Sequence, residues 1–359
     1  MTSPIRVLLV GAGHMGGSHG RAFHAIDGFE LCGVVTRGDS GARLAEELGG
    51  VPHYRDFAEA LTITQPDAVA ITSFAETHVP FATLALEARC HVFVEKPIAD
   101  NLAEAVELVE LATRQSRALV VGYILRHHPS WTSFIELARG LGKPLVMRMN
   151  LNQQSHGPEW ATHRAIMDST SPLVDCGVHY VDVMTQMTGA RAVRVHAIGA
   201  RLSDDLKPGM YNYGQLQVEF EDGSIGWYEA GWGPMMSETA FFIKDVIGPK
   251  GAISIESGLE TGGADSSDIH IHTATNRIRH HHADLDSDGL FARTDDLVQT
   301  LDEPDHDQLC RREQEWFLEA IRGNVAVDDH LADVVESLRI VLAADESIRS
   351  GQVIDIERG

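Results

Sequence analysis

The stretch Ile5-Arg6-Val7-Leu8-Leu9-Val10, which continues as Gly11-Ala12-Gly13-His14-Met15-Gly16, decides the fold of this chain. Its first six residues form a short apolar run rich in β-branched side chains, which predicts a buried strand. The glycines that follow have the spacing G-x-G-x-x-G and open a helical pattern. A strand, a glycine turn and a helix in this order predict the first unit of a dinucleotide-binding domain.

The glycines have separate expected roles. Gly11 permits the tight turn, Gly13 lets the backbone approach a pyrophosphate, and Gly16 allows the helix to pack closely on the strand. His14 and Met15 lie in the same turn, where the free N–H groups of the helix N-terminus would face phosphate. The alternative is that the glycines only make a turn.

The next hundred residues alternate between strand and helix patterns. Such alternation predicts a doubly wound parallel sheet, a Rossmann domain, over residues 1–125. The expected strands after the first are Glu30–Thr36, Ala68–Thr72, His91–Glu95 and Ala118–Tyr123. The expected helices are Ser40–Leu48, one that begins at Asp56, Glu76–Ala88 and Asn101–Arg117.

Residues 126–359 have a different texture and predict an α/β domain with a mostly antiparallel open sheet. Glu221-Asp222-Gly223-Ser224 is a hairpin turn signal between two of its strands. Residues 257–309 are rich in Asp, His and Gly and predict an irregular acidic excursion. The expected helices are Pro129–Arg139, Val174–Met187, Cys310–Arg322 and a closing helix, His330–Ser350; the expected strands are Pro144–Leu151, Ala192–Leu202, Gly214–Glu221, Ser224–Gly231, Thr239–Ile247 and Ala252–Glu256.

Composition excludes several classes of partner. The chain has 359 residues, 43% hydrophobic and 23% charged, which is typical of a two-domain globular protein. Its formal net charge of −23 disfavours nucleic acid and anionic membranes as partners. Four scattered cysteines, no long apolar run and no room for a signal peptide favour the cytoplasm.

The end of the second strand bears on the cofactor. An acidic residue there would accept a hydrogen bond from the ribose 2′-hydroxyl of NAD, but the sequence has Thr36 and Arg37. These side chains favour NADP, with its 2′-phosphate. NAD stays open, because Thr36 could also bind a bare ribose.

Two stretches carry candidate catalytic groups. Lys96 follows a strand at the edge where doubly wound sheets bind ligands, although it could be a solvated surface lysine. Helical spacing would put Asp175, His179 and Asp182 on one face, so that a carboxylate could orient the histidine as a general base. The alternatives are a core histidine or a metal site of His179, Asp175 and Asp182.

Further polar residues are weaker candidates. A set near the domain junction could bind substrate hydroxyls or could be plain surface. It consists of Arg126, His156, Trp160, His163 and Arg164. The run His280–His282, with His270 and His272 nearby, favours a solvated loop over a metal site, and we expect no metal.

The motifs together resemble the glucose–fructose oxidoreductase / inositol dehydrogenase / MocA (Gfo/Idh/MocA) family. The residues that carry the resemblance are Gly11–Gly16, Thr77-His78, Glu95-Lys96-Pro97, Gly122-Tyr123-x-x-Arg126, Asp175-x-Gly-x-His179-x-x-Asp182 and Phe317-x-x-Ala320-Ile321. The resemblance implies a catalytic set of Lys96, Asp175 and His179. It also implies a homo-oligomer, a dimer or tetramer, assembled through the sheet of the second domain.

The resemblance extends the cofactor site to Ser73, His78 and Glu95, with Lys96 in contact with both cofactor and substrate. Two places depart from the family pattern and leave the substrate open. Ser73-Phe74-Ala75-Glu76-Thr77-His78 stands where the family often has Pro-x-x-x-His, and Ser171-Pro172 stands where it has glycines.

The function this predicts is an NAD(P)-dependent oxidoreductase. It would transfer hydride between the nicotinamide and a secondary alcohol or ketone of a sugar, a sugar derivative or a cyclitol. His179 would act as base, Lys96 would stabilise the negative oxygen and Asp175 would hold the histidine or a second hydroxyl. The alternatives are NAD-assisted glycoside cleavage without net redox and a non-catalytic NAD(P)-responsive binding protein.

Overall fold

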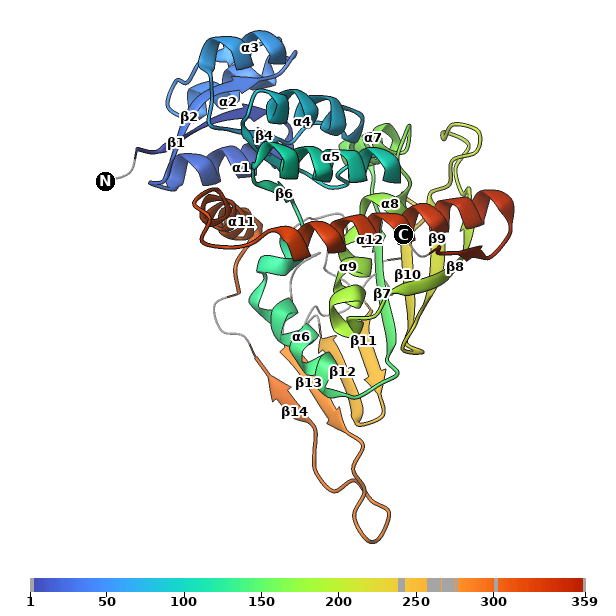
Figure 1. Ribbon diagram of the computed structural model, residues 1–359. Coiled ribbons are helices and arrows are strands. Elements are labelled where there is room, and N and C mark those ends of the chain that lie inside the picture. The colour runs from blue at the N-terminus through green and yellow to red at the C-terminus, as the bar shows by residue number, and fades with distance from the viewer. Residues whose placement is uncertain are drawn as a thin grey trace. The chain divides into compact units, whose positions relative to one another are not determined.

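A computed structural model describes residues 3–237, 243–256, 266, 275, 277–299 and 303–357 (Figure 1). The chain divides into two compact units. The first comprises residues 1–124 and 304–335, and the second comprises residues 125–303 and 336–359.

The first unit has a six-stranded sheet in the order β3-β2-β1-β4-β5-β6, with all neighbours parallel. This order is that of a Rossmann fold, so the predicted doubly wound sheet is confirmed. The strands are β1 (Ile5–Val10), β2 (Phe29–Val35), β3 (His53–Tyr54), β4 (Ala68–Ile71), β5 (His91–Val94) and β6 (Leu119–Val121).

Two helices of this unit begin where the sequence predicts, because a side chain caps each. Asp56 accepts from the Glu59 N–H at 2.8 Å, and Asn101 accepts from the Glu104 N–H at 2.9 Å. The helices that connect the strands are α1 (His14–Ala25), α2 (Ser40–Glu47), α3 (Phe57–Thr64), α4 (His78–Glu87) and α5 (Leu102–Gln115), with a 3₁₀ turn η1 (Ala75–Thr77) before α4.

The core of the first unit includes residues from far along the chain. Helix α11 (His306–Ile321) packs against α1. Its Phe317 is fully buried beside Phe29 and Phe93, with ring centroids 6.2 and 6.1 Å apart. The sequence assigns residues 304–335 to the second domain, whereas the structure groups them with the first, because this apolar face completes its core.

The second unit has a nine-stranded sheet in the order β14-β13-β12-β11-β7-β10-β9-β8-β15. Among the strands that the structure describes, only β7 and β10 are parallel to each other, so the predicted mostly antiparallel sheet is confirmed. Gly223, at φ 81°, turns the predicted hairpin between β9 and β10. The strands are β7 (Val146–Gln153), β8 (Ala192–Ala200), β9 (Tyr213–Phe220), β10 (Ile225–Trp232), β11 (Lys244–Gly248), β12 (Gly251–Glu256), β13 (Arg277–His282), β14 (Asp296–Val298) and β15 (Ile354–Asp355).

Helices cover one face of this sheet. Helices α8 and α9 pack on β10, and α6 packs on β11, β12 and β13. The last turns of α12 reach β8, where a Cβ on Gly199 would meet Ile348 at 3.0 Å. The elements are η2 (Ile124–His127), α6 (Pro129–Gly140), α7 (Gly157–Ile166), α8 (Pro172–Asp175), α9 (Gly177–Thr188) and α12 (Asp328–Ser350).

Three expectations need correction. The excursion predicted at 257–309 is wrong for β13, β14 and the start of α11, since β-ladder pairing and a capping box at Asp305 order these parts. His280–His282 form the end of β13 rather than a loop, while His270 and His272 lie outside the described residues. The helix predicted at Val174–Met187 is two helices that meet at Cys176.

Two further findings concern the whole chain. All four cysteines are free thiols. Among the described residues, no helix has both the length and the apolar character needed to cross a membrane.

Candidate functional site

The glycine turn after β1 has the geometry that its spacing predicts. A Cβ on Gly11, at φ +106°, would lie 2.7 Å from the Thr72 carbonyl, and a Cβ on Gly16 would lie 2.4 Å from the Gly11 oxygen. Neither position has room for a side chain. At Gly13, by contrast, no atom of the residues that the structure describes lies within 4 Å of the added Cβ. The turn is therefore tight at its base and open at its outer side.

This open side leads to the N-terminus of α1. Gly13 is the N-cap, no side chain in the described part of the chain caps the helix, and the first turn of the helix holds no acidic residue. The first N–H groups of a helix carry partial positive charge and bind anions when no cap satisfies them. The turn thus fits the pyrophosphate of a dinucleotide.

Lys96 lies at the same edge of the sheet as the glycine turn. Val10 of β1 pairs with Ile71 of β4, and Ile71 pairs with Val94 of β5, so these strands end together. Gly11 and Lys96 come one and two residues after those ends. Ligands of doubly wound sheets bind at this carboxyl edge.

The backbone beside Lys96 rests on a buried hydrogen-bond network. The Lys96 N–H donates to Glu95 Oε2 at 3.2 Å, and Glu95 Oε1 lies 2.7 Å from His19 Nε2. The other nitrogen of His19 lies 2.9 Å from the Gln314 side-chain amide. Glu95, predicted as a cofactor contact, is thus buried beneath the site and supports the backbone that carries Lys96.

A second buried histidine, His78, joins two loops at this edge of the sheet. His78 Nδ1 lies 2.7 Å from the Pro97 carbonyl oxygen, and Nε2 lies 3.0 Å from that of Ser73. His78 is 1% exposed. It ties the loop after β4 to the segment after Lys96, which is a positioning role.

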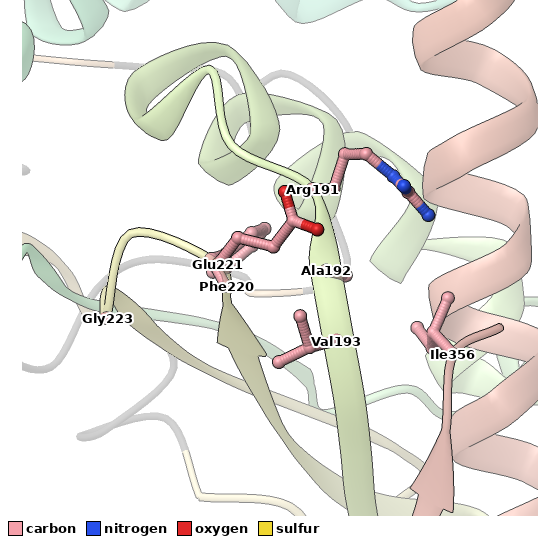
Figure 2. A pocket seen from close by; sticks show the side chains of 7 residues that line it. All are labelled: Arg191, Ala192, Val193, Phe220, Glu221, Gly223 and Ile356. Atoms are coloured by element: carbon pink, nitrogen blue, oxygen red, sulfur yellow. The ribbon is translucent and has the colours of Figure 1, made fainter. Parts of the chain in front are cut away.

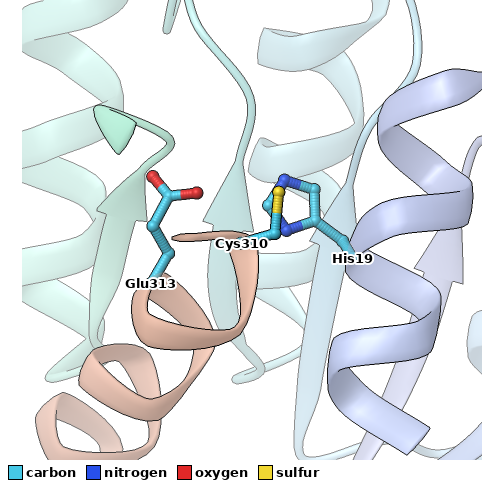
Figure 3. Close-up of side chains that lie close together, drawn as sticks. All are labelled: His19, Cys310 and Glu313. Atoms are coloured by element: carbon cyan, nitrogen blue, oxygen red, sulfur yellow. The ribbon is translucent and has the colours of Figure 1, made fainter. Parts of the chain in front are cut away.

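His19, Cys310 and Glu313 form a buried cluster below this network (Figure 3), with possible ligand atoms within 4.8 Å of one another. Both ring nitrogens of His19 already face Glu95 and Gln314, which argues against metal binding. Burial raises the pKa of Cys310, and burial together with Glu95 raises the pKa of Glu313 well above its ordinary value. The Cys310 thiol therefore stays protonated, and the cluster offers no thiolate.

A basic residue that the sequence reasoning missed lies close to the end of β2. Arg55, directly after β3, donates to the Arg37 carbonyl oxygen at 2.7 Å and to Asp39 at 3.2 Å. His53 Nε2 lies 3.0 Å from the Thr36 carbonyl oxygen. Arg37 and Arg55 thus give this strand end two guanidinium groups and one nearby carboxylate.

In the second unit, Asp175 and His179 flank the break between two helices. Asp175 ends α8, His179 lies in the first turn of α9, and both are half-buried. Cys176 stands between them, with its Sγ 3.5 Å from Asp175 Oδ2. The spacing of a single helix therefore does not define where the two side chains point.

A polar and aromatic wall lies next to Asp175. Gln153 and Trp232 pair at the ends of β7 and β10, where Trp232 Nε1 donates to Gln153 Oε1 at 2.7 Å. The His163 ring stacks on Trp232, with centroids 4.5 Å apart and planes 9° apart. Cys176 Sγ lies 4.0 Å from the same Gln153 oxygen. Asp175 and His163, both predicted from sequence, thus belong to one connected group.

The comparisons with known proteins agree with this architecture. The family model of the Gfo/Idh/MocA oxidoreductases with an NAD-binding Rossmann fold matches residues 5–123, and the C-terminal domain model of the same family matches residues 138–254. The chain belongs to this family. It is an oxidoreductase with an NAD-binding Rossmann domain.

Relatives within the family are named as dehydrogenases of sugars and cyclitols. The chain is 25% identical to the scyllo-inositol 2-dehydrogenase (NAD(+)) of Bacillus subtilis, over 99% of this chain and 98% of that protein. It is 26% identical to the D-glucoside 3-dehydrogenase of Escherichia coli, over 71% and 78%. The fold matches the Lactobacillus casei scyllo-inositol dehydrogenase with bound NAD(H) and scyllo-inositol, with a TM-score of 0.76, 19% identity and coverage of 98% and 99%.

Other predicted substrate residues have structural partners. Arg126 Nε donates to Asp182 Oδ2 at 2.9 Å, and Asp182 is 1% exposed, so this carboxylate is engaged in an ion pair. The metal alternative that included Asp182 loses support for that reason. Arg164 lies over the Trp160 ring at 5.7 Å and 3.6 Å from an exposed aspartate. His156 is the exposed N-cap of α7.

Two hollows in the second unit lie elsewhere. One, of about 520 Å³, lies at the start of β8 and is lined by Arg191, Glu221 and Ile356 among others (Figure 2). The other, of about 840 Å³, is lined by residues of β7, β8, β9 and β10, including Arg148 and Trp227. Neither is lined by a residue predicted to bind substrate.

Proposed function

We propose that this oxidoreductase transfers hydride between a nicotinamide and a secondary alcohol or ketone of a sugar, a sugar derivative or a cyclitol. The open turn at Gly13, on the same sheet edge as Lys96, is the observation that carries the proposal. The names of the relatives, which are dehydrogenases of inositols and glucosides, support the substrate class. A reducing compartment such as the cytoplasm fits the four free thiols.

The wall beside Asp175 supports a polyhydroxylated substrate. Stacked His163 and Trp232 offer an aromatic surface, and Gln153, Ser155 and Asp175 carry hydrogen-bonding groups close to it. Sugars and cyclitols combine C–H faces with rings of hydroxyls. Such ligands need both kinds of contact, because each unpaired polar group weakens binding.

The proposed mechanism assigns one task to each catalytic residue. The nicotinamide, when bound, supplies the hydride acceptor or donor. In the oxidation direction His179 takes the proton from the substrate hydroxyl, and the Lys96 ammonium stabilises the negative charge on that oxygen as the carbonyl forms. Asp175 orients His179 or holds a second hydroxyl. Proton transfer of this kind contributes about 10²- to 10⁴-fold to the rate.

The proposal includes a preference for NADP over NAD. Arg37 and Arg55 offer guanidinium groups at the end of β2, and guanidinium groups bind phosphate in a bidentate manner. Asp39 pairs with Arg55, which lowers the negative charge near a 2′-phosphate.

A homo-oligomer formed through the open face of the second sheet is also proposed. That face has a hollow of about 840 Å³, and Ile198, Ile225 and Ile247 are 58, 46 and 41% exposed on its strands. A second copy of the chain would cover these side chains.

The experiment that tests the function is a screen of polyols, glycosides and keto-sugars by absorbance of the reduced nicotinamide. We expect turnover with at least one cyclitol or sugar and its loss in His179→Ala. Cleavage of a chromogenic glycoside without added nucleotide would favour redox-assisted glycoside cleavage instead. Binding of cofactor without turnover across the panel would favour a binding protein.

A further inference from the structure

The end of β13 places two of three consecutive histidines on one face. Successive side chains of a strand point to opposite faces, so His280 and His282 lie together and His281 lies on the other side. The ring centroids of His280 and His282 are 4.1 Å apart. His281 instead has its Nδ1 2.9 Å from Asp295.

A carboxylate completes the group from the neighbouring strand. Asp296 of β14 pairs in register with His280, and its Oδ2 lies 2.8 Å from His282 Nε2. The possible ligand atoms of His280, His282 and Asp296 lie within 4.8 Å of one another. Within the described residues, no hydrogen bond holds the His280 ring.

The group lies at the border of the buried face of the sheet. In register, His280 stands beside Ile253, and both Ile253 and Ile278 are almost completely buried. His282 is 8% exposed, whereas about half of the Asp296 side chain is exposed. The donors are therefore shielded on one side and open to solvent on the other, which leaves a route for an ion.

We propose that His280, His282 and Asp296 bind one divalent transition-metal ion, Zn²⁺ being the ion that their donors fit best. Two imidazole nitrogens and one carboxylate oxygen are ligands that Zn²⁺ takes, and three protein ligands leave a position for water. The group contains no thiolate, which disfavours softer ions such as Cu(I).

The ion would join β13 to β14. These strands are the two arms of the hairpin that runs out from the end of the sheet in Figure 1. Arg293 already contacts Asp296 Oδ2 at 2.6 Å, and its positive charge opposes a cation there. Removal of this charge should therefore strengthen metal binding.

The test is a calorimetric titration of zinc sulfate into metal-stripped protein without an affinity tag. We expect one ion per wild-type chain, affinity at least tenfold weaker in His280→Gln and in Asp296→Asn, and tighter binding in Arg293→Ala. His281→Gln is the matched control, because this neighbour lies on the other face, and it should bind as wild type. Circular dichroism checks that each variant is folded.

Cobalt substitution separates this site from the buried cluster at Cys310. Co²⁺ held by nitrogen and oxygen should give visible d–d bands without a thiolate-to-metal charge-transfer band, and Cys310→Ser should leave them unchanged. The proposal is overturned if wild-type protein takes up no zinc, if His280→Gln binds it as tightly, or if the cobalt spectrum shows thiolate. None of these readouts depends on enzymatic activity.

Discussion

His19 Nε2 lies 2.7 Å from Glu95 Oε1, and Glu95 Oε2 accepts the N–H of Lys96. A buried hydrogen bond thus supports the backbone of the residue that we assign to the substrate oxygen. The relationship connects the helix after the glycine turn with the end of β5. It makes the internal structure of the first unit a determinant of where Lys96 is held.

Replacement of Glu95 by Gln should weaken this support. The change removes the charge from a buried hydrogen-bonded pair, which costs about 1–3 kcal/mol of unfolding free energy. Turnover should fall more than cofactor affinity, because the displaced residue is Lys96. Chemical denaturation and steady-state kinetics measure the two effects.

Glu110→Gln is the control for this substitution. Glu110 forms an exposed pair with Arg114 on α5, and such pairs contribute at most about 0.5 kcal/mol. Equal destabilisation by both substitutions would show that the buried pair has no special role.

The free energy of unfolding should decrease as the pH is lowered from about 6.5 to about 4. Burial, with like charges on His14 and His19, lowers the pKa of His306 to about 4 from 6.5, and burial lowers the pKa of His91 to about 4. In this window the unfolded chain binds more protons than the folded one, so stability is complete above pH 6.5 and is lost as the pH falls.

His306 alone should account for about 3 kcal/mol of this loss. His306→Gln should therefore flatten the profile of unfolding free energy from pH 7 to pH 4, measured by urea denaturation. Above pH 7, the profiles of unfolding free energy against pH should have the same slope in the variant and in the wild type. An unchanged slope in the acid window would contradict a buried, neutral His306.

Cofactor choice should depend on the two arginines at the end of β2. Arg37→Ala and Arg55→Ala should each lower kcat/KM for NADPH about tenfold, the loss of roughly one charged hydrogen bond, with little change for NADH. Arg114→Ala, on an exposed helix face, is the control. A wild-type preference for NAD of more than about tenfold would refute the proposal.

Assembly should depend on the open sheet face of the second unit. Ile225→Glu would replace an apolar side chain that lines the hollow by a charged one and should shift the protein from a dimer or tetramer of 39.2 kDa chains toward the monomer. Light scattering gives the mass. Ile63→Glu, on an exposed position of α3, should leave the mass unchanged; a monomeric wild type would count against the interface.

Local patterns predict the first unit well because its elements depend on local chemistry. The strand before Gly11 is a continuous apolar run, and Asp56 and Asn101 cap the helices where expected. What could not be predicted depends on distant contacts. Phe317 joins a core that includes Phe29 and Phe93, both of which lie far earlier in the chain, and nothing in its own helix indicates which unit it completes.

The candidate site shows the same contrast between residues that local patterns predict and residues that distant contacts bring together. The glycine turn and Lys96 lie at strand ends, which the sequence marks directly. The partners that support them, His19 and Gln314, are separated by 295 positions, and only folding brings them together. Trp232 and Gln153 depend on the parallel pairing of β7 and β10, which hydropathy patterns do not indicate. The polar surroundings of His280 and His282 predict a loop, whereas the pairing of β13 with β12 and β14 makes these residues part of a strand.

The claim that Lys96 and His179 act on the same substrate oxygen is the centre of this account. A double-mutant cycle on kcat/KM with Lys96→Met, His179→Asn and the double variant tests it most directly, with cofactor dissociation constants measured alongside. We predict losses of at least about 100-fold in each single variant and a double variant little worse than the poorer single one, because residues that act as a unit are not additive. Losses that multiply in the double variant, or a His179→Asn enzyme that turns over at the wild-type rate, would contradict the account.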